Sequence, residues 1–256
     1  MKALSIARRE KVLELLREEG TVFLKDLEKR FPEVSSMTLR RDLEYFENLG
    51  QAVRIRGGAK YLRTLSEQED VYALRAAKNQ EAKSKISKLA ARFIEPRRSV
   101  YIDAGSTGMF LARNLPDLNF SVVTSGINVA MELSKRYKPS VTVIGGLINR
   151  SNLAASGNRS ESQIDQLNID TALVVSSAFS VKNGFTVGNY DEGVLKRSII
   201  EKAEKVIMLL DGTKFGKTMP FTFAHMEDID IIITDKRPSD EIMELCEKSQ
   251  VEVIYE

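Results

Sequence analysis

The 256-residue chain is poor in the residues from which metal sites and many catalytic sites are built. It has one cysteine, Cys246, and one histidine, His225. An intrachain disulfide and a zinc site made of cysteine or histidine ligands are therefore excluded. Cys246 lies in an apolar helical window and is expected to be a buried thiol. No nucleophile motif accompanies His225, which argues for a structural histidine. The sequence implies no metal and no cofactor.

Long hydrophobic segments are also missing. The chain has no apolar run of 18 residues and no basic-then-apolar leader. These absences predict a cytoplasmic protein without a membrane partner. The net charge is only +2. Over residues 1–62, Lys and Arg outnumber Asp and Glu by 13 to 10, which gives +3, and the remainder has 25 against 26, which gives −1. This local excess is too small to identify a function by itself.

A predicted helix that begins after Ser35 carries the strongest local signal. Ser35 is a suitable N-cap, and Gly50 stands where a left-handed residue ends a helix. Apolar residues recur at helical spacing on one face, namely Leu39, Leu43 and Phe46. Away from that stripe lie hydroxyl groups and a basic pair, namely Ser36, Thr38, Arg40 and Arg41. Such a helix start suits phosphate contacts and guanine readout, so it predicts a DNA-reading helix. The alternative is a surface helix with solvated arginines.

The neighbouring segments favour the DNA-reading alternative. Residues 5–18 and 24–31 are predicted to form two further helices. After the third helix, apolar and basic residues alternate, as in a small hairpin or wing with a basic outer face. Two glycines then allow close backbone approach to phosphates, or form a plain turn. The residues predicted to contact DNA are Ser35, Ser36, Thr38, Arg40, Arg41, Arg54, Arg56, Gly57 and Gly58.

The rest of the chain is divided into a connector and a larger domain. Residues 63–98 are rich in Lys, Arg, Glu and Ala and are predicted to form a helical connector, which can hold two domains in a fixed relation. From residue 99 onward, short β-branched runs alternate with helical stretches. Strands are predicted at residues 100–103, 120–124, 141–144, 173–176, 206–210, 229–234 and 251–255. This pattern predicts an α/β domain over residues 99–256 with a mostly parallel sheet covered on both faces.

Small, acidic and hydroxylated residues follow several of the predicted strands. Ligands bind beyond the carboxyl ends of the strands in an open parallel sheet, where helix starts offer N–H groups to an anion. The residues predicted to form this site are Asp103, Gly105, Ser106, Thr107, Thr124, Ser125, Asn128, Gly145, Gly146, Glu192, Lys196 and Lys214. Either lysine can neutralise a phosphate or remain solvated. A phosphate is the expected occupant, although single turns of this kind often only cap the next helix.

Both halves of the chain resemble the DeoR family of bacterial transcription repressors. Residues 34–50 match its V-S-x-x-T-[IL]-R-R-D-L-x-x-L-x-x-x-G run, with Phe46 for the usual Leu, and residues 54–59 match R-x-x-G-G-A. Residues 103–107 match D-x-G-[ST]-T, and further matches lie at residues 124–128, 145–147, 192–197 and 211–215. Ser125 replaces a frequent Asn, and Val175 and Ala178 replace frequent glycines.

The resemblance implies a winged helix-turn-helix over residues 1–62, followed by an α/β domain similar to ribose-5-phosphate isomerase. It also implies a function. The chain would bind double-stranded operator DNA as a homo-oligomer, a dimer or higher, and a phosphorylated sugar or polyol would modulate that binding.

The alternative is an enzyme of the sugar-phosphate isomerase type. Such an enzyme needs a carboxylate base in the crevice. The isomerases that the domain resembles carry a D-G-A-D-E-type strand end and a G-G-G-x-A-x-x-x-E-K loop, and neither motif is present. Asp103, Glu192 and Asp211 remain as carboxylates, but no catalytic residue is predicted. A purely architectural DNA binder would leave the large α/β domain unexplained.

Overall fold

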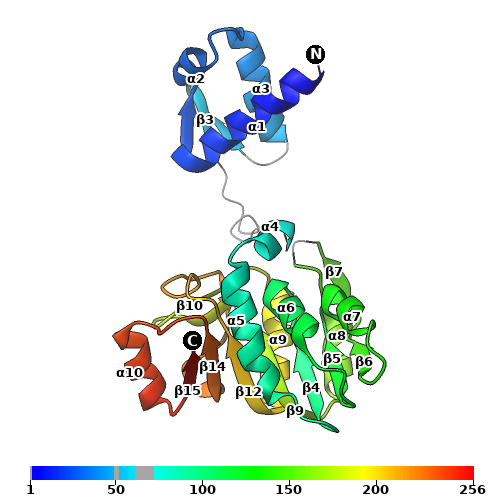
Figure 1. The fold of residues 1–256 in the computed structure, drawn as a ribbon. Helices are drawn as coiled ribbons and strands as arrows, with labels where there is room; N and C mark the ends of the chain where they lie inside the picture. The colour runs from blue at the N-terminus through cyan, green and yellow to red at the C-terminus, as the bar shows by residue number, and fades with distance from the viewer. Residues whose placement is uncertain (1, 49–51, 62–71, 151) are drawn as a thin grey trace. The chain divides into compact units, whose positions relative to one another are not determined.

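The computed structural model of the protein describes residues 2–48, 52–61, 72–150 and 152–256 (Figure 1). Its contacts divide the chain into two compact units, Met1–Gln68 and Glu69–Glu256. The helices α4 (Tyr72–Ala77) and α5 (Gln80–Ala90) both pack against α6 (Ser106–Asn114). This division differs from the separate connector expected over residues 63–98, because that segment's helices are part of the second unit.

The first unit has the element order of a winged helix-turn-helix. Its elements are α1 (Lys2–Glu19), β1 (Thr21–Phe23), α2 (Leu24–Arg30), α3 (Ser36–Asn48), β2 (Ala52–Ile55) and β3 (Gly58–Tyr61). Its core contains apolar side chains from all three helices, including Val12, Leu27 and Leu39. The predicted helices are confirmed, whereas Gly50, the expected helix end, lies outside the described residues.

The wing of this unit has one more strand than expected. Both β1 and β2 pair antiparallel with β3, which gives a three-stranded sheet. The expected alternation in β2 is wrong at Val53, whose side chain is 41% exposed, while Ala52 is buried. Among the residues of β2, Ala52 is the one that belongs to the core of this small unit.

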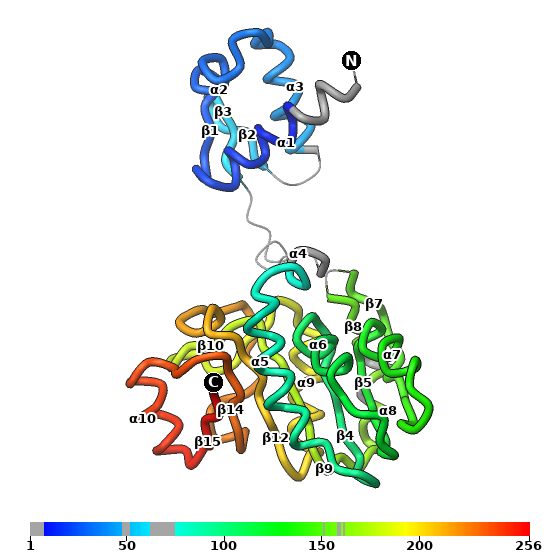
Figure 2. The backbone as a smooth tube through the Cα atoms, in the orientation of Figure 1, coloured from blue at the N-terminus to red at the C-terminus, as the bar shows by residue number. Residues whose placement is uncertain are grey.

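The second unit is built on one seven-stranded sheet in the order β15-β14-β12-β9-β4-β5-β6. Every pairing within it is parallel. Its strands are β4 (Ser99–Ile102), β5 (Ser121–Thr124), β6 (Ser140–Val143), β9 (Ile169–Val175), β12 (Ala203–Leu209), β14 (Ile231–Thr234) and β15 (Glu252–Tyr255). The last strand, β15, lies at one edge beside β14 (Figure 2). All seven predicted strands, and with them the α/β fold class, are confirmed.

Helices cover both faces of this sheet, which explains why its strands are apolar on both sides. α5, α6 and α7 (Ile127–Leu133) lie on the face turned to the viewer in Figure 1 and bury Ile86, Leu111 and Val129. The opposite core contains Ile164, Ile199 and Cys246 from α8 (Asn158–Ile164), α9 (Tyr190–Lys202) and α10 (Asp240–Lys248). Cys246 is buried as expected, and burial raises the pKa of its thiol to about 11.

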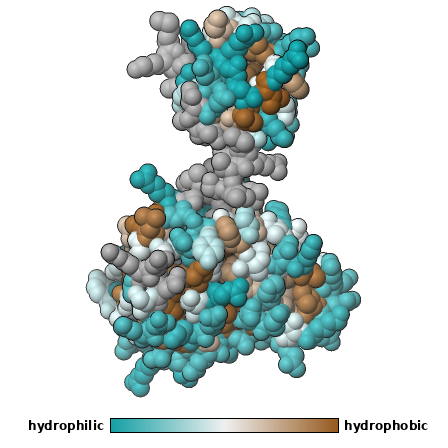
Figure 3. All heavy atoms as spheres, turned by 180° about the vertical axis from the view of Figure 1, so that it is seen from behind, coloured by the Kyte–Doolittle hydropathy of each residue, from teal (hydrophilic) through white to brown (hydrophobic). Residues whose placement is uncertain are grey.

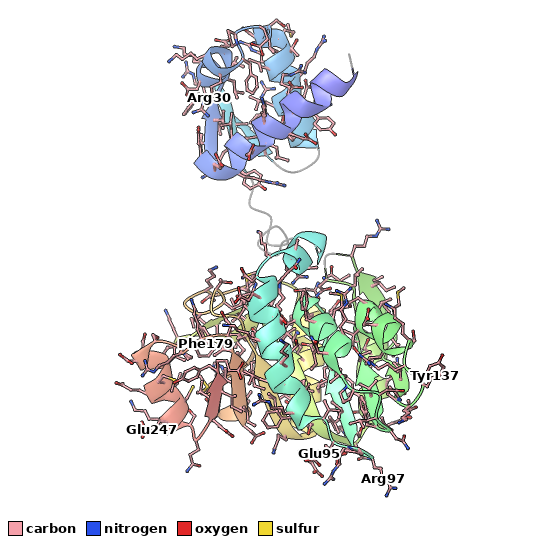
Figure 4. The ribbon with its side chains drawn as sticks, viewed as in Figure 1. Arg30, Glu95, Arg97, Tyr137, Phe179 and Glu247 are labelled. Carbon is pink, nitrogen blue, oxygen red and sulfur yellow. The ribbon has the colours of Figure 1, made fainter. Side chains whose placement is uncertain are left out.

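Two smaller sheets were not expected from the sequence. One is the hairpin β7 (Leu147–Asn149) with β8 (Ala154–Ser156). The other is antiparallel and contains β10 (Ala178–Ser180), β11 (Gly184–Val187) and β13 (Phe221–Ala224). The rings of Phe179 and Phe185 lie 4.6 Å apart in this second sheet, where Phe179 points into the unit (Figure 4). All four residues of β11 are buried.

One side of the second unit shows no extended apolar face (Figure 3). On the side of the second unit seen in Figure 3, hydrophobic residues form separate patches within a largely hydrophilic surface. His225 precedes a short 3-10 helix (Met226–Asp228) and its side chain caps that helix, which is a structural role. In the part of the chain that the structure describes, no helix is both long and apolar enough to cross a membrane.

Candidate functional site

Helix α3 presents a basic face to solvent. Ser35 caps the helix, because the Thr38 amide donates a hydrogen bond to Ser35 Oγ at 3.3 Å. The predicted apolar stripe is buried, whereas Ser36, Arg40 and Arg41 are exposed. Within the described residues, neither arginine side chain forms an ion pair. Their charges are therefore available to an external anion, as a DNA-reading helix requires.

A buried carboxylate behind this face fixes α3 to α1. The Asp42 side chain is 1% exposed and accepts hydrogen bonds from Arg8 Nε at 2.6 Å and Arg9 Nε at 2.8 Å. The bond to Asp42 raises the pKa of Arg8. The Arg9 guanidinium also lies 3.9 Å from the ring centroid of Tyr45. This contact of Asp42 was not predicted. Its burial could have been inferred from the sequence, because Asp42 falls within the helical stripe of buried residues.

The wing contributes two further exposed arginines, Arg54 and Arg56. Gly57 between β2 and β3 has φ +83 and open space around it, so it suits a turn at the tip. Gly58 is different. A Cβ there would lie 2.2 Å from the carbonyl oxygen of Val22, so this glycine allows β1 and β3 to pack closely. Its packing accounts for Gly58 without any DNA contact.

The second unit contains a cavity of about 200 Å³ at the carboxyl ends of β4, β9 and β12. The chain runs from β4 outward to β5 and β6, and then returns to β9 on the other side of β4. The cavity therefore lies at the switch point of the sheet, where ligands bind in open α/β folds. Six cationic and two acidic residues are among those that line it, namely Arg75, Lys78, Lys83, Lys196, Lys214, Lys217, Glu192 and Asp211.

The structure brings half of the predicted effector residues into this cavity. The lining includes Gly105, Ser106, Thr107, Glu192, Lys196 and Lys214. Gly105 has φ +104 and directly precedes α6, so the first turn of α6 opens on the cavity. Free N–H groups at such a helix start attract an anion. This is the arrangement that the residue 103–107 loop predicted.

The other predicted residues lie outside the described cavity lining. Asp103 lies directly behind it. Ser125 Oγ hydrogen-bonds the Tyr101 hydroxyl at 2.9 Å, and Thr124 Oγ1 accepts from the Gly126 amide at 3.0 Å. Asn128 Nδ2 donates to the Gly105 carbonyl oxygen at 3.2 Å and so supports the loop from behind.

Gly145 and Gly146 are further away from the cavity. The Gly145 carbonyl oxygen accepts a hydrogen bond from Ser160 Oγ at 2.7 Å. A Cβ at Gly146 would lie 2.6 Å from the Ser156 carbonyl oxygen. Both glycines follow β6, which is separated from the cavity by β5 in the strand order. Packing against Ser156 of β8 and Ser160 of α8 explains why residue 146 is a glycine, whereas a Cβ at Gly145 would make only ordinary contacts, at 3.7 Å or more.

Lys196 forms the centre of a buried ion-pair network. Its side chain is 0% exposed and contacts the carboxylates of Asp103 and Glu192, the latter at 3.2 Å. Glu192 also accepts from Asn152 Nδ2 at 2.6 Å, and Asp103 accepts from the Val175 amide at 2.9 Å. Burial alone would lower the pKa of Lys196, but the two carboxylates outweigh it and raise the pKa. The expectation of a solvated Lys196 is therefore wrong.

Two cationic side chains of the cavity lining are held by other groups of the protein. The charge of Lys196 is already balanced by two carboxylates, and Lys83 donates to the backbone carbonyls of Arg75 and Lys78. Burial, the largest effect, lowers the pKa of Lys83. Arg75, Lys78, Lys214 and Lys217 are the other cationic residues that line the cavity.

The lining also includes residues that were not predicted from the sequence, among them Arg75, Lys78, Asn79, Lys83, Asn152 and Lys217. The first four belong to the segment that was assigned to a connector, where a run of charged residues gives no local sign of a binding site. Among the described residues, no group of three or more His, Cys, Asp or Glu side chains is arranged to hold a metal ion.

An exposed basic helix in a winged helix-turn-helix, together with a cation-lined pocket in an α/β unit, defines a DNA-binding regulator with a sensor domain. Residues 8–64 match the family model of the DeoR-like helix-turn-helix domain, and residues 78–236 match the DeoR C terminal sensor domain. The chain belongs to the DeoR family of transcription regulators. It is not an enzyme, and the isomerase-like alternative is not favoured.

Two characterised relatives extend along most of the chain. The HTH-type transcriptional repressor GlcR of Bacillus subtilis is 31% identical over 87% of this chain and 85% of its own length. The HTH-type transcriptional regulator GlpR of Haloferax volcanii is 31% identical over 96% of both chains. Among solved structures, ribose 5-phosphate isomerase A of Methanocaldococcus jannaschii aligns with a TM-score of 0.40 and 14% identity, over 54% of this chain and 55% of that one.

Proposed function

We propose that the chain binds operator DNA through α3 and the β2–β3 wing, and that a phosphorylated sugar or polyol in the second unit's cavity changes this binding. The observation that carries the effector assignment is the excess of cationic over acidic lining residues beside the start of α6. The cavity volume of about 200 Å³ lies below the roughly 300–1,000 Å³ of sites for drug-sized ligands, so it favours a small compound.

The two ends of such a ligand have different partners in the lining. Ser106, Thr107 and Lys214 supply N–H, hydroxyl and ammonium donors for a phosphate. Glu192 and Asp211 would repel a phosphate, but their carboxylates accept hydrogen bonds from sugar or polyol hydroxyl groups. A compound with one anionic end and several hydroxyl groups therefore fits better than an anion alone.

The experiment is an operator titration. An operator is first selected from randomised DNA with the full chain, and its binding is followed by fluorescence anisotropy. Phosphorylated sugars and polyols, their unphosphorylated counterparts and inorganic phosphate are then added. We expect one phosphorylated compound to change the operator Kd by about 5- to 150-fold. If every compound leaves the operator Kd unchanged, the effector proposal is wrong.

The variant Thr107→Glu tests the position of the phosphate. It places a negative charge in the cavity lining, so the response should be lost while the unliganded protein still binds operator. Ser121→Glu is the matched control, because Ser121 is exposed at the amino end of β5. A full response in Thr107→Glu, with an unchanged melting temperature, would exclude the α6 start as the phosphate site.

We also propose that the DNA-binding form is a homo-oligomer with two-fold symmetry. One small winged unit contacts few base pairs, so a specific site requires two units on an inverted repeat. Light scattering of the full chain with and without operator measures this. A monomer that binds a single half-site at all accessible concentrations would contradict it.

A further inference from the structure

The turn between α4 and α5 forms one wall of the cavity. Arg75 is in α4, and Lys78 and Asn79 form the turn, and all three side chains line the cavity. Opposite them are Thr213 and Lys214, which follow β12. In the sequence, α4 is the first described element after β3 of the DNA-binding unit. The cavity is therefore lined in part by the segment through which the chain enters the sensor unit.

Asn79 fastens this turn to the loop after β12. Its Nδ2 donates hydrogen bonds to Asp211 Oδ1 and Thr213 Oγ1, both at 3.2 Å. Its backbone is left-handed, with φ +51, which is uncommon for a residue other than glycine. On the α5 side, Lys83 is 3% exposed, and its ammonium group donates hydrogen bonds to the carbonyl oxygens of Arg75 and Lys78. The turn is thus held from both sides of the cavity.

The positive charges around the cavity repel one another, so they oppose the contact between the α4–α5 turn and the loop after β12. Arg75 in α4, Lys78 on the turn and Lys214 on the loop line the same cavity, and after burial, the largest cause, the charges of Lys214 and Arg75 contribute to the lowered pKa of Lys83. Asp211 provides the opposing attraction. An anion between these cations lowers their mutual repulsion, so it stabilises the turn against the loop more than an uncharged ligand does. A ligand that favours one arrangement in this way shifts the equilibrium toward it.

We infer that the α4–α5 turn is part of the effector site, and that the hydrogen bonds of Asn79 to Asp211 and Thr213 transmit effector occupancy to α4. This inference rests on the proposed function. It assigns effector contact to Arg75 and Lys78, and it assigns coupling to Asn79. Binding and coupling then depend on different side chains, so they are separable by mutation.

Asn79→Gly isolates the coupling residue. Glycine accepts the left-handed backbone without strain, so only the side-chain hydrogen bonds are lost. Gln250→Gly is the matched control, because Gln250 also has a left-handed backbone, with φ +59, and is exposed beside β15. Binding is measured by calorimetry with inorganic phosphate, and coupling by the operator titration with the panel of phosphorylated sugars and polyols. Both measurements use the full chain.

At an effector concentration that saturates the variant in calorimetry, we expect Asn79→Gly to change the operator Kd at least about 5-fold less than the unmodified chain does, because 5-fold is the lower limit of typical coupling. Arg75→Gln with Lys78→Gln should instead weaken phosphate binding about 10-fold or more, since two charge-assisted contacts are lost.

The remaining outcomes separate the two proposals. A normal operator response in Asn79→Gly overturns the inference and leaves the proposed function intact. If Asn79→Gly binds phosphate at no concentration tested, the coupling role is also overturned, because Asn79 would then act through binding alone. If the unmodified chain neither binds phosphate nor responds to any compound, the proposed function itself is wrong, and the inference fails with it.

Discussion

The two units use positive charge in opposite ways. On α3, Arg40 and Arg41 are exposed and have no ion-pair partner within the described residues. On α9, Lys196 is buried between Asp103 and Glu192. From the sequence, all three side chains were predicted to contact a phosphate-bearing ligand. A buried cation that two carboxylates already compensate is less available to an external anion than an exposed one.

The largest expected effect is the loss of the buried cation. Lys196→Met leaves the carboxylates of Asp103 and Glu192 buried without their partner. Removal of one member of a buried ion pair costs about 3–5 kcal/mol. The unfolding free energy of the second unit should fall by that amount in urea unfolding of the full chain, followed by circular dichroism.

Two further variants sharpen this measurement. Lys217→Met removes an exposed lining cation and should change the unfolding free energy by less than about 0.5 kcal/mol. The triple variant Lys196→Met, Asp103→Asn, Glu192→Gln should recover part of the lost stability, because no buried charge is left unpaired. Equal unfolding midpoints for Lys196→Met and Lys217→Met would remove the distinction between buried and exposed cations.

The DNA-binding unit also contains a buried charge, Asp42, so the loss of this carboxylate should destabilise that unit. Asp42→Asn removes the carboxylate between Arg8 and Arg9. Because both arginines are partly exposed, their loss of a partner costs less than in a fully buried pair, about 2–3 kcal/mol. Urea unfolding measures the cost, and operator affinity should fall because α3 loses its attachment to α1. Glu44→Gln on the exposed side of α3 is the control. An equal effect of this variant would contradict the role of Asp42 in attaching α3 to α1.

The strands of the second unit were predictable because each is a continuous apolar run covered by helices. The β7–β8 hairpin and the β10–β11–β13 sheet were not, because their short segments do not stand out from the neighbouring loops as continuous apolar runs. The turn at Asn183 and Gly184 contains polar and small residues, and only the position of Phe185 against Phe179 and Phe223 shows that a buried strand follows.

The site was partly predictable for a topological reason. The sequence shows which residues follow each strand, but not which strands are neighbours. The cavity lies over β12, β9 and β4, so the loops after these strands meet, while Thr124 ends β5 and Gly145 follows β6 farther along the sheet. The burial of Lys196 had a local signal. It lies four residues after Glu192 and is adjacent to Leu195, three positions before Ile199, on the apolar face of α9.

A smaller effect is expected from the exposed arginines of α3, and it should appear in binding, not in stability. If Arg40 or Arg41 forms a bidentate contact to a base, replacement by Ala costs about 1–3 kcal/mol of operator affinity and relaxes one position of the operator. The unfolding free energy should change by less than about 0.5 kcal/mol. Arg92→Ala, an exposed arginine of the second unit, is the matched control. Unchanged operator binding by the double variant Arg40→Ala, Arg41→Ala would exclude α3 as the reading helix.

The smallest effect on DNA affinity is expected from the wing. Its dependence on salt concentration and on DNA sequence is as informative as its size. Arg54 and Arg56 are exposed on β2 and on the turn that follows it, so we expect them to contact phosphates. Loss of one phosphate contact lowers the slope of log affinity against log salt by about 0.9, equally for operator and unrelated DNA. Anisotropy titrations of Arg54→Ala and Arg56→Ala at several salt concentrations measure this slope. If either variant instead loses affinity for one operator sequence only, the wing reads bases, and the division between a reading helix and a positioning wing no longer holds.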